Sequence, residues 1–242
     1  MPNSEVMLAK LTRREFREGI EGGRYTAAVI CVGSNEQHSE HLAMEHDMAS
    51  VTAVAREAAK RLYPRVIVAA PVAVGISEHH MHHKGTLSAG AGSWLGVVFD
   101  AADSLARHGI QSILILNGHG GNTAPIRGVF ESWRYRLKNS TPGVNLQFCS
   151  YWELIPKEIL ERHMETAIIP GHAKEFETSI GLALFPENVR KEIIPLLEDK
   201  DPMLATAEKG RIFFEEAVSQ TAEYLKGMMD GRIGQPDLKH FP

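Results

Sequence analysis

The chain has 242 residues, of which 43% are hydrophobic and 23% charged, and its formal net charge is −4. These are values of an ordinary globular protein, and the lack of a long basic stripe argues against nucleic acid as a partner. No apolar stretch approaches the roughly 18 residues of a membrane span, and the N-terminus lacks a signal-peptide pattern, so we expect a cytoplasmic protein without membrane partners. Cys31 and Cys149 lie in separate apolar runs without metal-binding spacing, and are predicted to be buried and unpaired.

Hydrophobic periodicity predicts alternating helices and strands along most of the chain. Strands are expected over residues 25–32, 66–71, 111–116 and 144–150. Helices are expected over residues 8–20, 46–62, 93–108, 122–138, 157–164, 175–184 and 203–229, the last loosened at Gly210 and Gly227. A long loop rich in His, Gly and Ser fills residues 72–90, and loops of this length inside compact domains usually carry function.

Continuous apolar strands separated by amphipathic helices predict an α/β fold: a three-layer α/β/α sandwich with a mainly parallel sheet. With no linker or repeat, residues 1–242 are interpreted as a single domain. Ligands of open α/β sheets bind beyond the carboxyl ends of the strands. Functional residues are therefore expected in the segments 33–47, 72–90, 117–122 and 151–153.

The segment after the first strand carries Glu36 and His38 on alternate residues, with Asp47 nine residues further on. Carboxylates and imidazoles are the ligands that hold zinc, manganese or iron. The alternative is a polar loop in which Asp47 stabilises the first turn of a helix. That alternative explains Asp47 well, but it leaves the charged groups at positions 36 and 38 without partners.

Two further segments carry ligand-type residues. Residues 117–122 read N-G-H-G-G-N, which lacks both the last glycine of a dinucleotide fingerprint and the lysine of a P-loop, and leaves His119 as the only large side chain. Residues 171–179 place His172 before Glu175 and Glu177, a pattern typical either of a helix start or of a general base beside a metal ligand.

Two other features leave alternatives open. The internal run from His79 to His83 is either a solvated loop or a loop from which at least one histidine, His80 first, reaches the site. Trp152, after the fourth strand, is either packed in the core or a platform for the substrate.

Together these segments resemble the creatininase family of metal-dependent amidohydrolases, over about residues 25–187. The family pattern G-S-x-E-Q-H followed by an aspartate stands here at positions 33–38 and 47, N-G-H-G-G-N at 117–122, and H-A-G-E-x-E-T-S as H-A-K-E-F-E-T-S at 172–179. The chain departs from creatininase itself at Gly121, Ile168 and Ile169, where that enzyme has a carboxylate, a tryptophan and an aspartate. Creatinine is therefore a doubtful substrate.

The resemblance implies two divalent ions per chain, zinc, manganese or iron, with Asp47 as the bridge. The implied metal ligands are Glu36, His38, Asp47, His119 and Glu177, with Glu175 as the alternative fifth ligand. It also implies His172 as the residue that shuttles protons, and we expect Glu175 to assist it. The residues expected to contact the substrate are His80, Trp152 and Ser77.

The implied activity is hydrolysis of a small molecule by a hydroxide that bridges the two ions. The expected bond is that of a cyclic amide, a formamide or a related non-peptide C–N bond, or of a sugar lactone. Alternatives are creatinine amidohydrolase proper, a metal-dependent sugar isomerase or epimerase, and a non-catalytic metal-binding protein. The family also implies a homo-oligomer, a hexamer.

Overall fold

Four strands form one parallel sheet in the order β2-β1-β3-β4, in a computed structural model that describes residues 5–69 and 71–236. The strands are β1 (Ala27–Val32), β2 (Val66–Val68), β3 (Ser112–Asn117) and β4 (Asn145–Ser150). Ala27 pairs with Val66 on one side and with Ser112 on the other, so β1 and β3 occupy the centre of the sheet.

The central strands are buried along their whole length because both faces of the sheet are covered. Side chains alternate between the faces of a strand, so Val29 and Cys31 enter one core and Ala28 and Ile30 the other. Cys31 and Cys149 are free and buried, as predicted.

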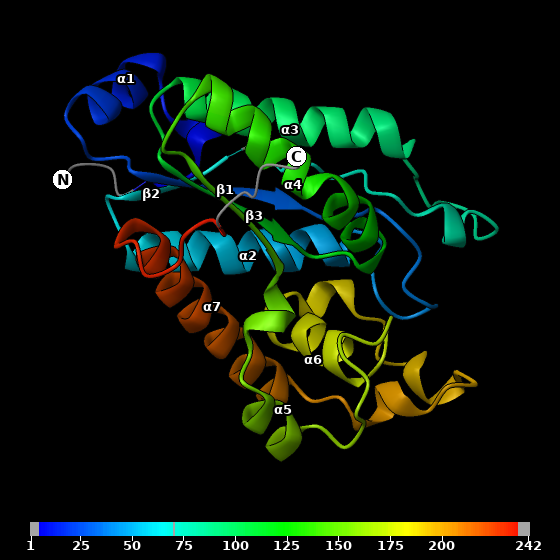
Figure 1. The fold of residues 1–242 in the computed structure, drawn as a ribbon. Helices are drawn as coiled ribbons and strands as arrows, with labels where there is room; N and C mark the ends of the chain where they lie inside the picture. Colours follow the sequence, from blue (N-terminus) through cyan, green and yellow to red (C-terminus); the bar gives the residue numbers. More distant parts are fainter. Residues whose placement is uncertain (1–4, 70, 237–242) are drawn as a thin grey trace.

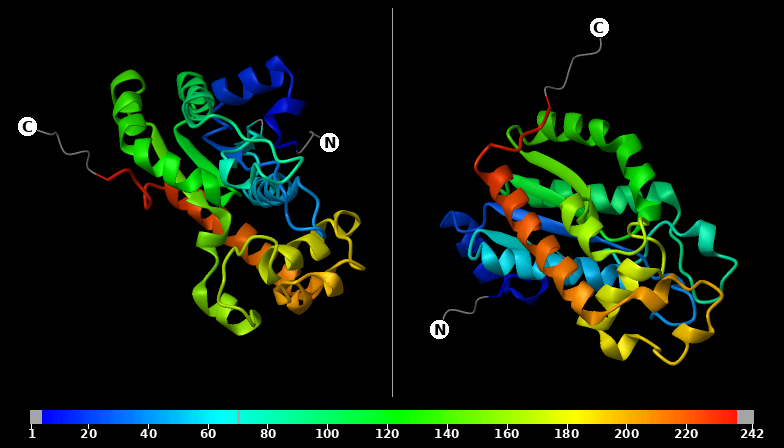
Figure 2. Two further views of the ribbon diagram at one scale, coloured as in Figure 1. Left: turned by 90° about the vertical axis from the view of Figure 1, so that its right-hand side faces the viewer. Right: turned by 90° about the horizontal axis from the view of Figure 1, so that it is seen from below.

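One face of the sheet is covered by α1 (Arg13–Glu21), α3 (Ala91–Arg107) and α4 (Thr123–Ser140). The other is covered by α2 (His46–Arg61) and α7 (Ala207–Met229) (Figure 1). The short helices α5 (Lys157–His163) and α6 (Glu175–Leu184) gather beyond α7 at one end of the molecule (Figure 2). The expected α/β class with a parallel sheet between helical layers is confirmed.

Two helices begin later than periodicity predicted, because capping residues set their starts. Residues 8–10 form a separate 3₁₀ turn, and α1 begins after Thr12, whose side chain forms a capping box with Glu15. Likewise α7 begins after Thr206, which accepts a hydrogen bond from the Lys209 amide, while residues 201–204 form another 3₁₀ turn. The strand expected over 66–71 ends at Val68, and position 70 lies outside the described residues.

The glycine at position 210 does not interrupt α7. It lies where α6 crosses the helix, and a Cβ built there would stand 1.9 Å from the Ser179 carbonyl oxygen. Gly210 therefore permits close packing of two helices, and one of them, α6, carries Glu177 towards the sheet.

The carboxyl ends of β1 and β3 flank the point where the chain changes direction across the sheet, since β1 leads to β2 on one side and β3 leads to β4 on the other. Such a switch point is the usual place for a ligand in an open α/β sheet. No helix within residues 5–69 and 71–236 combines the length and apolar character needed to cross a bilayer.

Candidate metal centre

The carboxylate of Asp47 lies between two imidazoles at this switch point. Asp47 is in the first turn of α2, with Oδ1 3.0 Å from His38 Nε2 and Oδ2 3.0 Å from His119 Nδ1. A Cβ at Gly118 would lie 2.4 Å from the Asp47 carbonyl oxygen. The glycine therefore lets the loop that carries His119 approach the start of α2.

The ring of His119, when it is neutral, presents an unprotonated nitrogen to the carboxylates. Its Nε2 lies 3.1 Å from the carbonyl oxygen of Ile76 and 3.2 Å from Ser77 Oγ. Because a carbonyl oxygen only accepts hydrogen bonds, Nε2 carries the proton of the neutral ring. The lone pair of Nδ1 then faces Asp47 and Glu36, whose Oε1 is 3.3 Å away. Metal-binding histidines are usually oriented in this way, by a hydrogen bond at the ring nitrogen that does not bind the ion.

His38 is oriented in the same way from the other side. Its Nδ1 donates to the backbone oxygen of Glu36 at 3.1 Å, which directs Nε2, and its lone pair when the ring is neutral, towards Asp47. Glu177 Oε2 lies 3.7 Å from that nitrogen and accepts a hydrogen bond from the Ala173 amide at 2.6 Å. The five residues predicted as metal ligands therefore converge. His119, with Glu36 beside it, lies at one oxygen of Asp47, and His38, with Glu177 beside it, lies at the other.

The residues fit a divalent metal by burial and by chemistry. Glu36, Asp47 and Glu177 are at most 5% exposed, so three carboxylates share one buried region. Within the described part of the chain, Glu36 Oε2, His38 Nε2 and Asp47 Oδ2 are buried without a hydrogen-bond partner. Buried polar atoms are rarely left unpaired unless an ion or water completes them. Ligand atoms of Glu36, His38 and Asp47 lie within 4.8 Å of one another, a spacing that can hold an ion.

The metal-free chain compensates for these carboxylates by holding protons. Burial alone would lower the pKa of His38, but Asp47 and Glu177 outweigh it and raise that pKa to about 9. Burial is likewise outweighed at His119, where the neighbouring carboxylates of Asp47 and Glu36 raise the pKa to about 10. Burial and the neighbouring Asp47 raise the pKa of Glu177, although the charge of His38 opposes the shift. A cation at this position would replace those protons.

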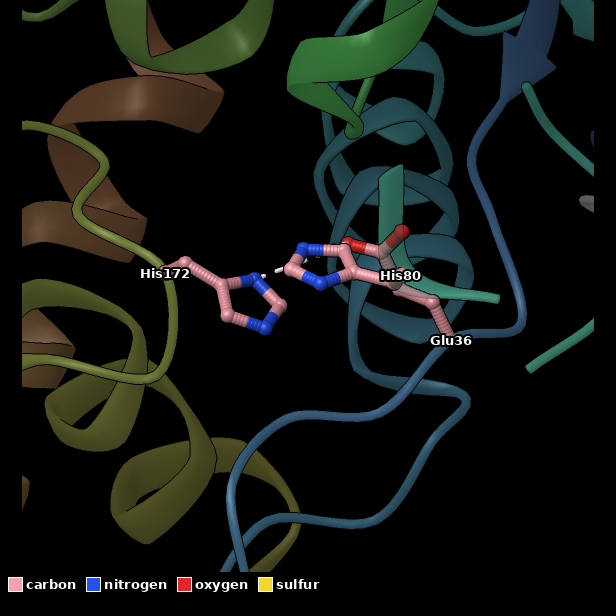
Figure 3. Close-up of side chains that lie close together, drawn as sticks. All are labelled: Glu36, His80 and His172. Carbon is pink, nitrogen blue, oxygen red and sulfur yellow. Dashed lines mark ion pairs between the residues drawn. The ribbon is translucent and has the colours of Figure 1, made fainter. Parts of the chain in front are cut away.

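A cavity of about 320 Å³ opens over this centre, with His80 and His172 on its wall. The two rings come from the loop after β2 and the loop before α6, and their side chains meet that of Glu36 (Figure 3). His172 Nδ1 and His80 Nε2 lie 3.5 and 3.8 Å from Glu36 Oε1. Burial and then repulsion from His38 lower the pKa of His172 to about 4, so its ring is neutral at pH 7. The cavity is therefore lined by imidazoles as well as by candidate ligands.

Some histidines of the loop from 79 to 83 reach the site, whereas others are exposed to solvent. His79 lines the cavity beside His80, and its ring stacks on that of His119 with centroids 5.8 Å apart. His82 and His83 are exposed and do not line the cavity. The contribution of His79 was not predicted, because adjacent histidines in a loop look alike in sequence.

Three residues expected at the site face elsewhere. Glu175 is fully buried and bonds with the amides of Glu165 and Thr166 and with Lys209 Nζ, so its side chain joins the helices rather than lining the cavity. Trp152 packs edge-on against Tyr151 in the core under the sheet, because residues 151–154 form a capped 3₁₀ turn after β4. Ser77 is buried behind His119, where it bonds with that ring and with Ser34 Oγ at 2.5 Å.

Gln37 holds the two cavity histidines, a role that sequence reasoning missed. Its Nε2 is 2.7 Å from His172 Nε2 and 3.1 Å from His80 Nδ1, and its Oε1 accepts a hydrogen bond from the Ser39 amide at 2.8 Å. The only signal in the sequence is its place between two candidate ligands.

Comparisons with known proteins identify the family of the chain. The model of the creatininase family, described as creatinine amidohydrolase, matches residues 9–201. Creatinine amidohydrolase of Pseudomonas putida is 27% identical over 197 residues, which cover 77% of this chain and 75% of that protein. The mycofactocin precursor peptide peptidase of Mycobacterium ulcerans (strain Agy99) is 28% identical over 241 residues, with 87% and 88% covered.

A solved structure of a mutant creatininase of the Zn-Zn type superposes with a TM-score of 0.79 at 25% identity, covering 92% of this chain and 97% of that one. The fold and the matched length point the same way. The chain belongs to the creatininase family of hydrolases.

Proposed function

We propose that this protein is a metal-dependent hydrolase that uses two divalent ions to cleave a C–N bond of an amide, or the ester bond of a lactone. The observation that carries the proposal is Asp47, whose two oxygens each lie 3.0 Å from a different imidazole. Glu36 completes one side, at His119, and Glu177 the other, at His38. Zinc, manganese and iron all suit this set of carboxylates and imidazoles.

Bound at these residues, divalent ions would supply Lewis acidity, which activates water near neutral pH and polarises a carbonyl group. The chain supplies the remaining functions. Gly120, Gly121 and Gly171 offer backbone rather than side chains to the substrate along the cavity wall. His172 faces the cavity through Nδ1, and we assign to it proton transfer to the leaving nitrogen or oxygen.

The expected substrate is an amide, formamide or lactone whose scissile bond reaches the carboxylates and imidazoles at the base of the cavity of about 320 Å³. Peptide bonds are included among the candidate amide bonds, because one relative is named a peptide peptidase. Creatinine is expected to be turned over at least ~100-fold less well than the best substrate, since Gly121, Ile168 and Ile169 stand where creatininase has a carboxylate, a tryptophan and an aspartate.

The proposal is tested by reconstituting the protein with zinc, manganese or iron(II) and screening formamides, cyclic ureides, lactones and short peptides for hydrolysis. The control is Asp47→Asn, which keeps the shape of the side chain but weakens its binding to cations. We expect at least one class to be hydrolysed by the wild type and none by the variant. Deuterium uptake into a recovered substrate without hydrolysis would contradict the proposal and favour an isomerase.

A further inference from the structure

Glu36, His80 and His172 form a cluster whose spacing would suit a further metal ion, in addition to the two proposed at Asp47. Their ligand atoms lie within 4.8 Å of one another, and the three side chains point at a common centre (Figure 3). Glu36 is 2% exposed and its Oε2 has no hydrogen-bond partner among the described residues. An ion bound here would share Glu36 with the proposed centre and block the wall of the cavity.

The amide of Gln37 makes this cluster unsuitable for an ion. Since the Ser39 amide can only donate, the atom of Gln37 that faces it at 2.8 Å is the oxygen. The NH₂ group must then face the imidazoles, with one hydrogen for each ring: His172 Nε2 at 2.7 Å and His80 Nδ1 at 3.1 Å. The Gln37 backbone amide donates to Thr86 Oγ1, which fixes the residue in its loop.

Each ring nitrogen that accepts from Gln37 is unprotonated, so the single proton of each neutral ring sits on the other nitrogen. Those nitrogens are His172 Nδ1 and His80 Nε2, the two that face Glu36. A nitrogen that carries a proton has no lone pair for a metal. The same two N–H groups can instead donate to Glu36 or to a bound substrate.

We propose that Gln37 is a positioning residue that holds the proton on the cavity-facing nitrogens of His172 and His80 and thereby keeps an ion out of the Glu36–His80–His172 cluster. The proposal rests on the proposed function, because it concerns histidines beside the two-ion centre. It also defines how His172 moves a proton. The proton that the attacking water releases replaces the one that Nδ1 gives to the leaving atom, so the ring ends in the tautomer in which it began and Nε2 keeps its hydrogen bond from Gln37.

Two near-isosteric variants separate positioning from packing. Gln37→Glu keeps an acceptor for the Ser39 amide but offers the rings an acceptor in place of a donor, whereas Gln37→Met removes both functions. Gln111→Glu, an exposed residue at the amino end of β3 and so at the opposite end of the strands from the site, is the control for added charge. The ¹⁵N chemical shifts of the His80 and His172 rings report which nitrogen is protonated, with assignments from His80→Gln and His172→Gln. Zinc bound per chain is measured in parallel by titration with a competing chelator.

In the wild type and in Gln111→Glu we expect the proton on His172 Nδ1 and His80 Nε2. In Gln37→Glu both tautomers should reverse, and a further zinc ion should bind about tenfold or more tightly than it binds the wild type, with Gln37→Met intermediate. A purely structural role predicts the opposite order, with Gln37→Met the more disturbed. Wild-type tautomers and zinc binding in Gln37→Glu would overturn the proposal. If the wild type bound no zinc, the two-ion function would fail, and the tautomers of the metal-free protein would still decide the role of Gln37.

Discussion

At the residue scale, Asp47 is the group on which both candidate ion positions depend, because its oxygens face different imidazoles. Asp47→Asn should reduce bound metal from about two ions per chain to about none, as measured by elemental analysis of protein purified without chelators. Asp103→Asn, on the outer side of α3, is the matched control and should keep both ions. Full occupancy in Asp47→Asn would show that the ligand assignment is wrong.

His172 separates chemistry from metal binding. His172→Gln removes the ring but leaves the five candidate ligands in place, so metal content should be unchanged. If His172 transfers a proton in the reaction, kcat should fall by about 10²–10⁴-fold, the usual contribution of a positioned acid or base. Metal analysis and steady-state kinetics on the same preparation test this. Unchanged kcat with both ions bound would exclude His172 from proton transfer.

The raised pKa values of His38 and His119, about 9 and about 10, predict that metal binding releases protons. At pH 7 the metal-free rings are protonated, and each must lose a proton before its nitrogen binds an ion. Affinity should therefore rise with pH, by about tenfold per unit for each proton released, and level off above pH 9–10. Titration calorimetry in buffers of different ionisation enthalpy counts the protons. A result of none at pH 7 would contradict these assignments.

At the scale of elements, the approach of α6 to α7 places Glu177, and Gly210 makes that approach possible. Gly210→Ala would put a Cβ 1.9 Å from the Ser179 carbonyl oxygen, so we expect destabilisation of about 1–3 kcal/mol despite the better helix propensity of alanine. Gly128→Ala in α4 is the matched control, since its Cβ would meet no atom within 4 Å and should stabilise by about 0.5–1 kcal/mol. Denaturant unfolding measures both, and equal effects would contradict the packing argument.

At the scale of the whole molecule, we propose the homo-oligomer that the family resemblance implies, a hexamer. Several large apolar side chains are exposed on the single chain, among them Val97 at 56% and Leu196 at 76%. Light scattering at micromolar concentration should give several times 26.8 kDa. A monomer under those conditions would contradict this expectation.

The hydrophobic pattern of the sequence was sufficient to predict the class of the fold and most of its helices and strands. The strands are continuous apolar runs because both faces of the sheet are covered, so β1 and β3 were predicted within two residues of their observed ends. Helix starts were less predictable where a cap decides them, as Thr206 does for α7. The resemblance named Glu36, His38, Asp47, His119 and Glu177, and each comes from a segment whose own residues indicated ligands.

Only the tertiary structure decided what each neighbouring residue does. Glu175 and Glu177 are two positions apart on one helix, so they face different directions, and the fold alone turns Glu177 to the cavity and Glu175 to Lys209. The fold likewise decides that Gln37 contacts the cavity histidines, that Ser77 lies behind His119 and that Trp152 packs in the core. The sequence shows which residue types lie near the carboxyl ends of the strands. Which of their side chains face the site depends on hydrogen bonds with segments that are distant in the sequence, and only the tertiary structure brings those segments together.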